Sequence, residues 1–469
     1  MSTAQSPTAP GETGRPSGPT HRLNRALSFG GLLALAVSDI TPMASLLIIA
    51  PVVLSLAGTA ALWAYIIGCF IALNVAACMG EMGSIYPVSG GQYSIVHRVL
   101  GGPAGFVAML DYVVQAVFLP ATIVLGIGTY LHALTPVIPI SLSSAIAMVV
   151  VTILAALRIQ IGAAVVAVFL GIEVTVITIL AIDGFAHWNQ PFSIVTSPTI
   201  AHGGTLTAVS TGAVIAALAT TLFSVNGYDS TINFAEETRG PASNIGKAVV
   251  ISALTGIVLE IVPFVAGLFG AQDLKAYLSS STPLTDLVTA TWSRTLADVI
   301  IVGALFAVFN AVLAITLQFS RIVWSSARDR AWPEPVNALL GRIHPRFHSP
   351  WVATILSGAV ATGLCFAADL VTAVTFTSLL IVTLYGLVAI SALVSRVRDR
   401  GLIRPSRMWL WPIPPIIALV GVVIAITQQA AHDLYIVGGD LRRRPDLLLR
   451  LPPPLPAYAV GAAHRRRGL

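Results

Sequence analysis

Long apolar stretches separated by short polar loops dominate the pattern of this chain. Eleven of them come close to or exceed the roughly 20 residues that a helix needs to cross a bilayer. They cover residues 28–57, 60–80, 102–130, 141–157, 161–182, 207–235, 245–270, 296–325, 351–368, 370–395 and 408–428. This pattern predicts an all-α integral membrane protein with eleven recognisable transmembrane helices, all within one domain that spans residues 26–435.

Polar residues interrupt two of these stretches. The first is broken at Ser38-Asp39-Ile40-Thr41-Pro42, where Pro42 cannot donate a backbone hydrogen bond. The sixth is broken at Ser224-Val225-Asn226-Gly227-Tyr228-Asp229, which is rich in poor helix formers. Unwound backbone at membrane depth is tolerated only where it lines protein or a wet cavity. Two broken helices therefore predict a transport site, with a simple proline kink as the alternative for the first.

Composition supports the membrane class, and the charge distribution gives an orientation. Apolar residues make up 56% of the chain and charged residues only 10%, against about 25% charged in soluble domains. When the loops are assigned to alternating sides, 17 of the 26 Lys and Arg residues fall on the N-terminal side and two on the other. By the positive-inside rule the N-terminus is cytoplasmic, and the protein lies in the cell membrane. This asymmetry also argues against a nucleic-acid partner, despite the net charge of +6.

The two ends of the chain differ from the apolar domain. Residues 1–25 are rich in Pro, Gly, Ser and Thr, so we expect a disordered cytoplasmic N-terminus. Around Ile436 the sequence becomes apolar, as at the start of a twelfth helix, but three adjacent arginines, Arg442 to Arg444, and further prolines follow. Residues 436–469 therefore form an aberrant Pro/Arg-rich tail, and we interpret it as a shifted reading frame or truncation that removed the twelfth helix.

Four blocks of residues resemble one known family. The block around the sixth-helix break continues as Asn233-Phe234-Ala235-Glu236-Glu237-Thr238-Arg239-Gly240-Pro241. The other three are Gly80-Glu81-Met82-Gly83 with Ser89-Gly90-Gly91-Gln92-Tyr93, Ala327-Arg328-Asp329 with Trp332-Pro333, and His344-Pro345-Arg346-Phe347 with Pro350-Trp351. Together and in this order they resemble the amino acid–polyamine–organocation (APC) superfamily of permeases. The Gly80 block looks like that family's loop after helix 2.

The resemblance implies a leucine-transporter-type fold of two inverted five-helix repeats, with the substrate held between broken helices 1 and 6. The substrate-binding residues predicted there are Asp39, Ile40, Thr41, Met43, Ala44, Ser45, Phe223, Ser224, Val225 and Asn226. Free N–H groups around Thr41 to Ser45 can hold a carboxylate, and carbonyls near Asp39 and Phe223 can hold an ammonium group. Phe223 is either an aromatic lid or an ordinary packing residue.

The chain also departs from the family pattern. Thr41-Pro42-Met43-Ala44-Ser45 stands where many members carry a Gly-rich break. Some proton-coupled relatives have a Lys in helix 5, whereas stretch 161–182 has none and carries only Glu173. That coupling scheme therefore cannot be transferred to this chain.

We interpret the protein as a secondary active permease that moves amino acids by alternating access, with proton-coupled import. The alternatives are an amine, polyamine or other organocation permease, and an amino acid exchanger. Asp39 could pair with a cationic amine or bond backbone freed by Pro42. Candidates for coupling or gating are Asp229, Glu236, Asp111 and Gln115, although interhelical hydrogen bonding is the preferred role for Asp111, Gln115, Glu173 and Glu260. The expected partners are a small amino acid or amine, a coupling proton and the bilayer.

Other classes of protein fit less well. All nine histidines fall in loops, helix ends or tails, which argues against a hydrolase or metalloenzyme at membrane depth. The three cysteines, Cys69, Cys78 and Cys365, lie in apolar helices without metal-binding or redox spacing, so we expect them to be packing residues. Channel filters use symmetric repeats or charge rings, which two different breaks do not resemble. We predict no enzyme activity, cofactor or metal.

Overall fold

The computed structural model describes residues 27–87, 90–157, 163–202, 205–235, 238–347 and 349–427. The expected disordered N-terminus, the aberrant tail at 436–469 and the coupling candidate Glu236 lie outside these residues. In chain order the elements are α1 (Phe29–Ile40), α2 (Pro42–Ala44), the π-helix η1 (Ser45–Ile49), α3 (Ala50–Ala57), the 3₁₀ turn η2 (Gly58–Ala60), α4 (Ala61–Ile85), α5 (Gly91–Leu100), α6 (Gly102–Leu134), α7 (Ile140–Ala156), α8 (Ala163–Ala186), α9 (Ser193–Thr196), β1 (Thr199–His202), β2 (Thr205–Ala208), α10 (Thr211–Ser224), α11 (Ser230–Asn233), α12 (Ser243–Gly270), α13 (Leu274–Ser279), α14 (Pro283–Thr291), α15 (Arg294–Arg328), α16 (Glu334–Leu340), α17 (Trp351–Ala367), α18 (Leu370–Arg398) and α19 (Ile413–Thr427).

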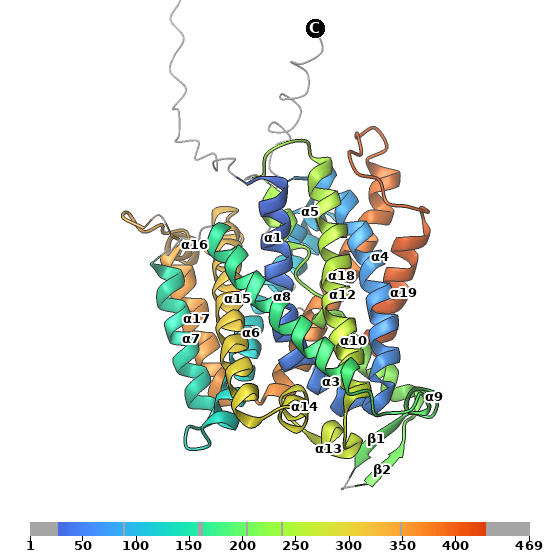
Figure 1. The fold of residues 1–469 in the computed structure, drawn as a ribbon. Helices are drawn as coiled ribbons and strands as arrows, with labels where there is room; N and C mark the ends of the chain where they lie inside the picture. The colour runs from blue at the N-terminus through green and yellow to red at the C-terminus, as the bar shows by residue number, and fades with distance from the viewer. Residues whose placement is uncertain are drawn as a thin grey trace, which may run out of the picture.

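The long helices run side by side as one bundle (Figure 1). One end of the bundle carries α5 and α16, and the other carries α9, α13, α14 and the β1–β2 hairpin. Within the described part of the chain, six helical runs are long and apolar enough to cross a membrane, and four shorter apolar helices accompany them. The protein is thus predominantly helical, and each of the eleven predicted stretches contains a helix.

Apolar side chains cover the outside of the bundle. On α7, Ile146, Val149, Val150 and Ile153 are each more than 40% exposed. Such continuous apolar surface would be a liability in water, and it is the surface that a lipid environment requires. The interior, by contrast, includes carboxylates such as Glu81, Glu173 and Glu260 at no more than 4% exposure. The bundle is therefore organised as a multi-pass membrane protein.

The sixth predicted helix begins later than the pattern indicated. Residues 207–210 were predicted to be helical, but Thr207 and Ala208 belong to strand β2, and α10 starts at Thr211. Strands β1 and β2 pair antiparallel, with Thr199 opposite Ala208 and His202 opposite Thr205. Alternating β-branched residues on an exposed segment favour a strand, and the apolar average across 207–211 concealed that preference. The helix predicted over residues 207–210 is therefore wrong, whereas the predominantly helical fold is confirmed.

The block Gly80-Glu81-Met82-Gly83, predicted to be a loop after the second helix, lies inside α4. Helix α4 continues to Ile85 because the Glu81 carboxylate is fully buried by partners from a distant part of the chain. Arg396 and Arg404 donate to it at 2.7 and 2.5 Å, and the Met408 N–H donates at 2.8 Å. These donors replace the water that the carboxylate loses on burial, so the helix can extend past the apolar stretch.

Close backbone contact through small residues holds the second and seventh segments together. A Cβ atom on Gly80 in α4 would lie 2.9 Å from the carbonyl oxygen of Gly246 in α12, and one on Gly246 would lie 2.6 Å from that of Gly80. Because lipid provides no hydrophobic drive for helix association, such small-residue contacts supply the van der Waals packing instead. They place α12 firmly beside the core of the bundle.

The cysteines provide a test of this packing. Cys69, Cys78 and Cys365 are reduced and no more than 5% exposed. A maleimide reagent is therefore expected to leave all three unlabelled in the folded protein and to label them after denaturation, as mass spectrometry would show. A Gly401→Cys variant, whose site is in an exposed loop with open space around it, is the positive control. Rapid labelling of a native cysteine would contradict the packing role.

Candidate functional site

The first helix is interrupted between α1 and α2. Thr41 adopts a left-handed backbone conformation with φ 52°, which is costly for a residue with a Cβ atom. Pro42 follows at the first position of the next helical segment, where its missing N–H costs nothing. The chain then continues as the π-helical turn η1 before it returns to α-helix at Ala50. Strained backbone of this kind persists only where its surroundings hold it.

The sixth helix is interrupted between α10 and α11, over Val225 to Asp229. Gly227 has φ 120°, a conformation that strongly favours glycine. A Cβ atom at Gly227 would lie 2.6 Å from the backbone of Asp39 and Ile40. The two interruptions therefore touch each other, backbone against backbone.

Side chains also connect the two interruptions. The Ser45 hydroxyl donates to the Ser224 carbonyl oxygen at 2.6 Å, and the Ser224 hydroxyl donates to Glu260 on α12 at 2.7 Å. The Asn226 amide donates to the Tyr385 hydroxyl on α18 at 2.9 Å. Backbone and hydroxyl groups freed by the breaks thus find partners within the protein, as a nonpolar environment demands.

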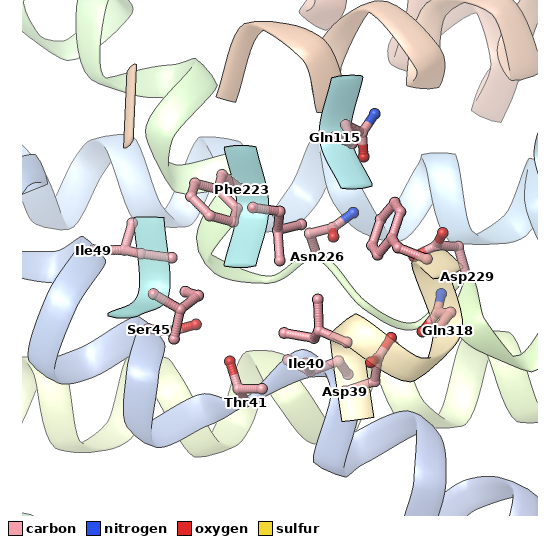
Figure 2. A pocket seen from close by; sticks show the side chains of 14 residues that line it. Asp39, Ile40, Thr41, Ser45, Ile49, Gln115, Phe223, Asn226, Asp229 and Gln318 are labelled. Atoms are coloured by element: carbon pink, nitrogen blue, oxygen red, sulfur yellow. The ribbon is translucent and has the colours of Figure 1, made fainter. Parts of the chain in front are cut away.

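A cavity lies between the two interruptions (Figure 2). Helices α6 and α15 complete its wall, and the lining residues are Asp39, Ile40, Thr41, Ser45, Ile49, Gln115, Leu119, Ile123, Phe223, Asn226, Asp229, Ile315, Gln318 and Phe319. The volume open to the centre of a water molecule is about 20 Å³. Since one water needs roughly 10–15 Å³ by this measure, a solute can be accommodated only if the walls move.

The cavity has a polar end and an apolar end. Figure 2 shows Asp39, Gln318 and Asp229 together at one end, and Phe223 and Ile49 at the other. Among the described residues that line the cavity, two carboxylates are the charged groups, and none carries a positive charge. The arrangement suits a solute with a hydrogen-bond-donating head and an apolar body.

Each carboxylate at the polar end is held by neutral donors. With its amide nitrogen directed at Asp39, Gln318 donates to both carboxylate oxygens at 2.9 and 3.1 Å, and its amide oxygen accepts from Asn233 at 2.7 Å. Asp229 accepts from Gln92 at 2.7 Å and from the Tyr112 hydroxyl at 3.1 Å. Both carboxyl groups lie at the same end of the cavity. No cation among the described lining residues balances them, so a cation or a proton is the natural complement.

The backbone after the first break is less available than the sequence suggested. The Met43 N–H donates to the Glu173 carboxylate of α8 at 2.7 Å, and the Ser45 N–H donates to the Thr41 carbonyl oxygen at 3.0 Å. Met43 and Ala44 do not line the cavity. The N–H groups predicted to hold a substrate carboxylate are therefore partly occupied by the protein itself.

Most residues predicted for substrate binding do line the cavity, namely Asp39, Ile40, Thr41, Ser45, Phe223 and Asn226. Met43, Ala44, Ser224 and Val225 do not; they pack behind the broken backbone. Of the coupling candidates, Asp229 and Gln115 line it, whereas Asp111 lies behind Gln115 and accepts its amide hydrogen bond at 2.9 Å. The roles of these residues in binding and coupling stay predictions.

Sequence reasoning missed six lining residues, Ile49, Leu119, Ile123, Ile315, Gln318 and Phe319. Five of them are apolar residues within apolar helices, and nothing local distinguishes them from residues that face lipid. Gln318 is different, because an amide at the centre of an apolar helix is costly and usually functional. That signal was present in the sequence.

A bundle of membrane helices with a small polar cavity between two backbone breaks defines a membrane transporter. Residues 27–437 match the model of the amino acid permease family, and the chain belongs to that family. The family consists of transporters, so the protein is a transporter and not an enzyme.

Three relatives illustrate the range of the family. An uncharacterised transporter of Mycobacterium tuberculosis is 27% identical over 370 residues, covering 76% of this chain and 77% of the relative. The methylthioribose transporter of Bacillus subtilis is 24% identical over 421 residues, covering 84% and 86%. The branched-chain amino acid permease BcaP of Bacillus subtilis is 22% identical over 321 residues, covering 63% and 65%. The two characterised relatives are named for different substrates, so the family alone does not define the solute.

Proposed function

We propose that the protein is a secondary active carrier that imports a small solute bearing an amino group. Amino acids are the first class to consider, because the family is that of the amino acid permeases and the relative BcaP is a branched-chain amino acid permease. The observation that carries the proposal is the cavity between the two breaks, whose only charged lining groups among the described residues are Asp39 and Asp229. A protonated amine is the solute group that complements two carboxylates.

The proposal includes the two inverted five-helix repeats and eleven membrane crossings predicted from the sequence. Their orientation has the N-terminus in the cytoplasm. Lys275 lies in α13 and Arg294 begins α15, both at the hairpin end. Arg396 and Arg398 lie in the last turn of α18 at the opposite end, and Arg404 follows that helix. An excess of Arg at the α5 end supports a cytoplasmic location for that end.

Alternating access follows from the size of the cavity. Since the cavity has room for little more than water, the walls must separate toward one side and then the other. At the α5 end, the Tyr93 hydroxyl donates to Asp329 at 2.9 Å, and the Tyr86 hydroxyl donates to Asp399 at 2.5 Å. These contacts hold α5 and the end of α4 against α15 and α18. Opening toward the cytoplasm would require them to break.

We further propose that import is coupled to protons. The motivation is that Asp39 and Asp229 line the same end of the cavity with no cation among the described lining residues, so that a proton can compensate a negative charge there. In proteoliposomes with an inwardly directed proton gradient, uptake of a labelled substrate is expected to exceed uptake without the gradient. A protonophore should remove that excess. Uptake that follows a sodium gradient and ignores the protonophore would overturn proton coupling while leaving the carrier function in place.

A second class of substrate, amines without a carboxylate, is favoured by a specific observation. The cavity holds carboxylates but no cationic side chain among its described lining residues, so it offers less to a substrate carboxylate than to an amine.

A further inference from the structure

The α18–α19 connection, residues 399–412, joins two helices at the α5 end of the bundle (Figure 1). From Arg396 to Trp411 the sequence has Asp399 as its single acid, against five arginines. The arginines are Arg396, Arg398, Arg400, Arg404 and Arg407. The end of α18 and the segment that follows it therefore carry a strong excess of positive charge, of the kind that attracts anionic lipid.

Contacts with α4 hold the buried side of this connection in place. The Glu81 carboxylate accepts from Arg404 at 2.5 Å and from the Met408 N–H at 2.8 Å. The Ser84 hydroxyl accepts from the Ser406 N–H at 3.1 Å. Because both ends of the turn are tied to one helix, the connection presents its remaining side chains from a defined backbone.

Two of the arginines have no protein partner. Arg400 and Arg407 are exposed, and none of the described residues forms an ion pair or a hydrogen bond with either guanidinium group. The nearby acids are engaged elsewhere, since Glu81 binds two other arginines and Asp399 accepts from a tyrosine hydroxyl. A free guanidinium group is well suited to bind a phosphate through two parallel hydrogen bonds.

Exposed apolar side chains lie between these arginines in the sequence. Ile403 is 80% exposed and Leu410 is 71% exposed, and Leu402 and Trp409 are exposed as well. The boundary between lipid headgroups and acyl chains accommodates cationic and apolar groups side by side, whereas water leaves the apolar area uncovered. The phosphate of an anionic phospholipid matches the arginines, and its acyl region matches the apolar residues.

We propose that the α18–α19 connection is a binding surface for anionic phospholipid. The phosphate accepts hydrogen bonds from Arg400 and Arg407, and the upper part of the acyl chains lies against the exposed apolar residues, Leu402, Ile403, Trp409 and Leu410. Bound lipid stabilises the end of the bundle at which Glu81 connects α4 to α18. This inference concerns a second ligand and does not depend on which solute the cavity carries.

The test compares two lipids on the purified full-length protein in detergent. Phosphatidylglycerol has a net negative charge, whereas phosphatidylcholine carries the same phosphate neutralised by its own cation. By native mass spectrometry, phosphatidylglycerol is expected to bind at least about tenfold more tightly. It should also raise Tm more at equal concentration, because a ligand that binds the folded state stabilises it. Equal binding of the two lipids would overturn the proposal.

Variants on the exposed side of the connection locate the site. Arg400→Gln/Arg407→Gln should lower the affinity for phosphatidylglycerol at least about tenfold, since each basic residue near the surface adds to the attraction of anionic lipid. Ile403→Ser should lower it at least about threefold, because less apolar area is then covered by the lipid. The matched control Arg342→Gln/Arg346→Gln removes two charges from the exposed loop after α16 and should bind phosphatidylglycerol normally.

The remaining outcomes distinguish lipid from other ligands. Equal losses in the two double variants would indicate a general attraction to basic surface and would overturn the site. Glycerol phosphate is added as a competitor, and displacement of the lipid by an equal concentration of it would mean that the arginines recognise a soluble anion, so the lipid assignment would fail. Unchanged binding by Ile403→Ser would also contradict the lipid assignment. The carrier function is tested separately by uptake, so it stands or falls independently of these results.

Discussion

Replacement of Gly227 by alanine is expected to reduce transport at least about 30-fold. The new Cβ atom would lie 2.6 Å from the backbone of Asp39 and Ile40, and the φ of 120° would be strained for any residue other than glycine. Overpacking costs about 1–3 kcal/mol and left-handed backbone about 1–2 kcal/mol more. Together these penalties oppose the conformation in which the two interruptions meet. Initial uptake rates in proteoliposomes, normalised to folded protein, provide the measurement.

The same substitution at another glycine controls for general effects. Gly303 lies within α15 with open space around its Cβ position, so Gly303→Ala should fold and transport like the unaltered protein. Within a helix alanine is favoured over glycine by roughly 1 kcal/mol. Normal uptake by Gly227→Ala would mean that the close contact between the interruptions is not needed for transport.

Asp39→Asn is expected to weaken substrate binding about 10- to 100-fold. The substitution preserves the shape of the side chain and a hydrogen bond to Gln318, whose amide can rotate, but it removes the negative charge at the polar end of the cavity. A hydrogen bond to a charged group contributes about 1.5–3 kcal/mol, which corresponds to this range of affinity. The affinity is measured by calorimetry with leucine or isopentylamine, whichever binds the unaltered protein more tightly.

A matched control separates this effect from a change in net charge. Glu334 is an exposed acid on α16, remote from the cavity, so Glu334→Gln should bind the ligand normally. The pH dependence of uptake is recorded for the same variants. If Asp39→Asn retained both its affinity and its pH dependence, Asp39 would have neither a substrate nor a coupling role.

Proton coupling and the binding of a protonated amino group depend on the same pair of carboxylates in different ways. A protonated amine brings its own positive charge to Asp39 and Asp229, whereas a proton can occupy the pair when the amine has left. A carrier built this way exchanges one positive charge for another at a site without a fixed cation among its described lining residues. Because a proton and a protonated amine compete for Asp39 and Asp229, the affinity for the amine should rise as the external pH rises through the range in which these two residues lose their proton.

The predicted interruptions illustrate how far local sequence reasoning reaches. Pro42 and the Asn226-Gly227 pair destabilise an ordinary helix. The two helix breaks can therefore be recognised from the local sequence, without knowledge of the neighbouring helices. The start of the sixth helix and the end of the second were placed wrongly because neither is decided by a single residue. The start of the sixth helix depends on strand pairing in the β1–β2 hairpin, which an apolar average conceals. The end of the second depends on contacts of Arg396 and Arg404 with Glu81, which are distant in the sequence.

Sequence alone determined that the chain is a helical membrane protein with breaks at Thr41 and near Gly227, because a bilayer forces each spanning segment to satisfy its backbone internally and penalises every breaker. Tertiary structure alone decided which faces of α6 and α15 enclose the cavity, that Gln318 holds Asp39, and that Glu173 occupies the Met43 N–H. Those contacts join residues more than 100 positions apart, and in lipid the packing of whole helix surfaces, not the hydropathy of any one segment, selects them.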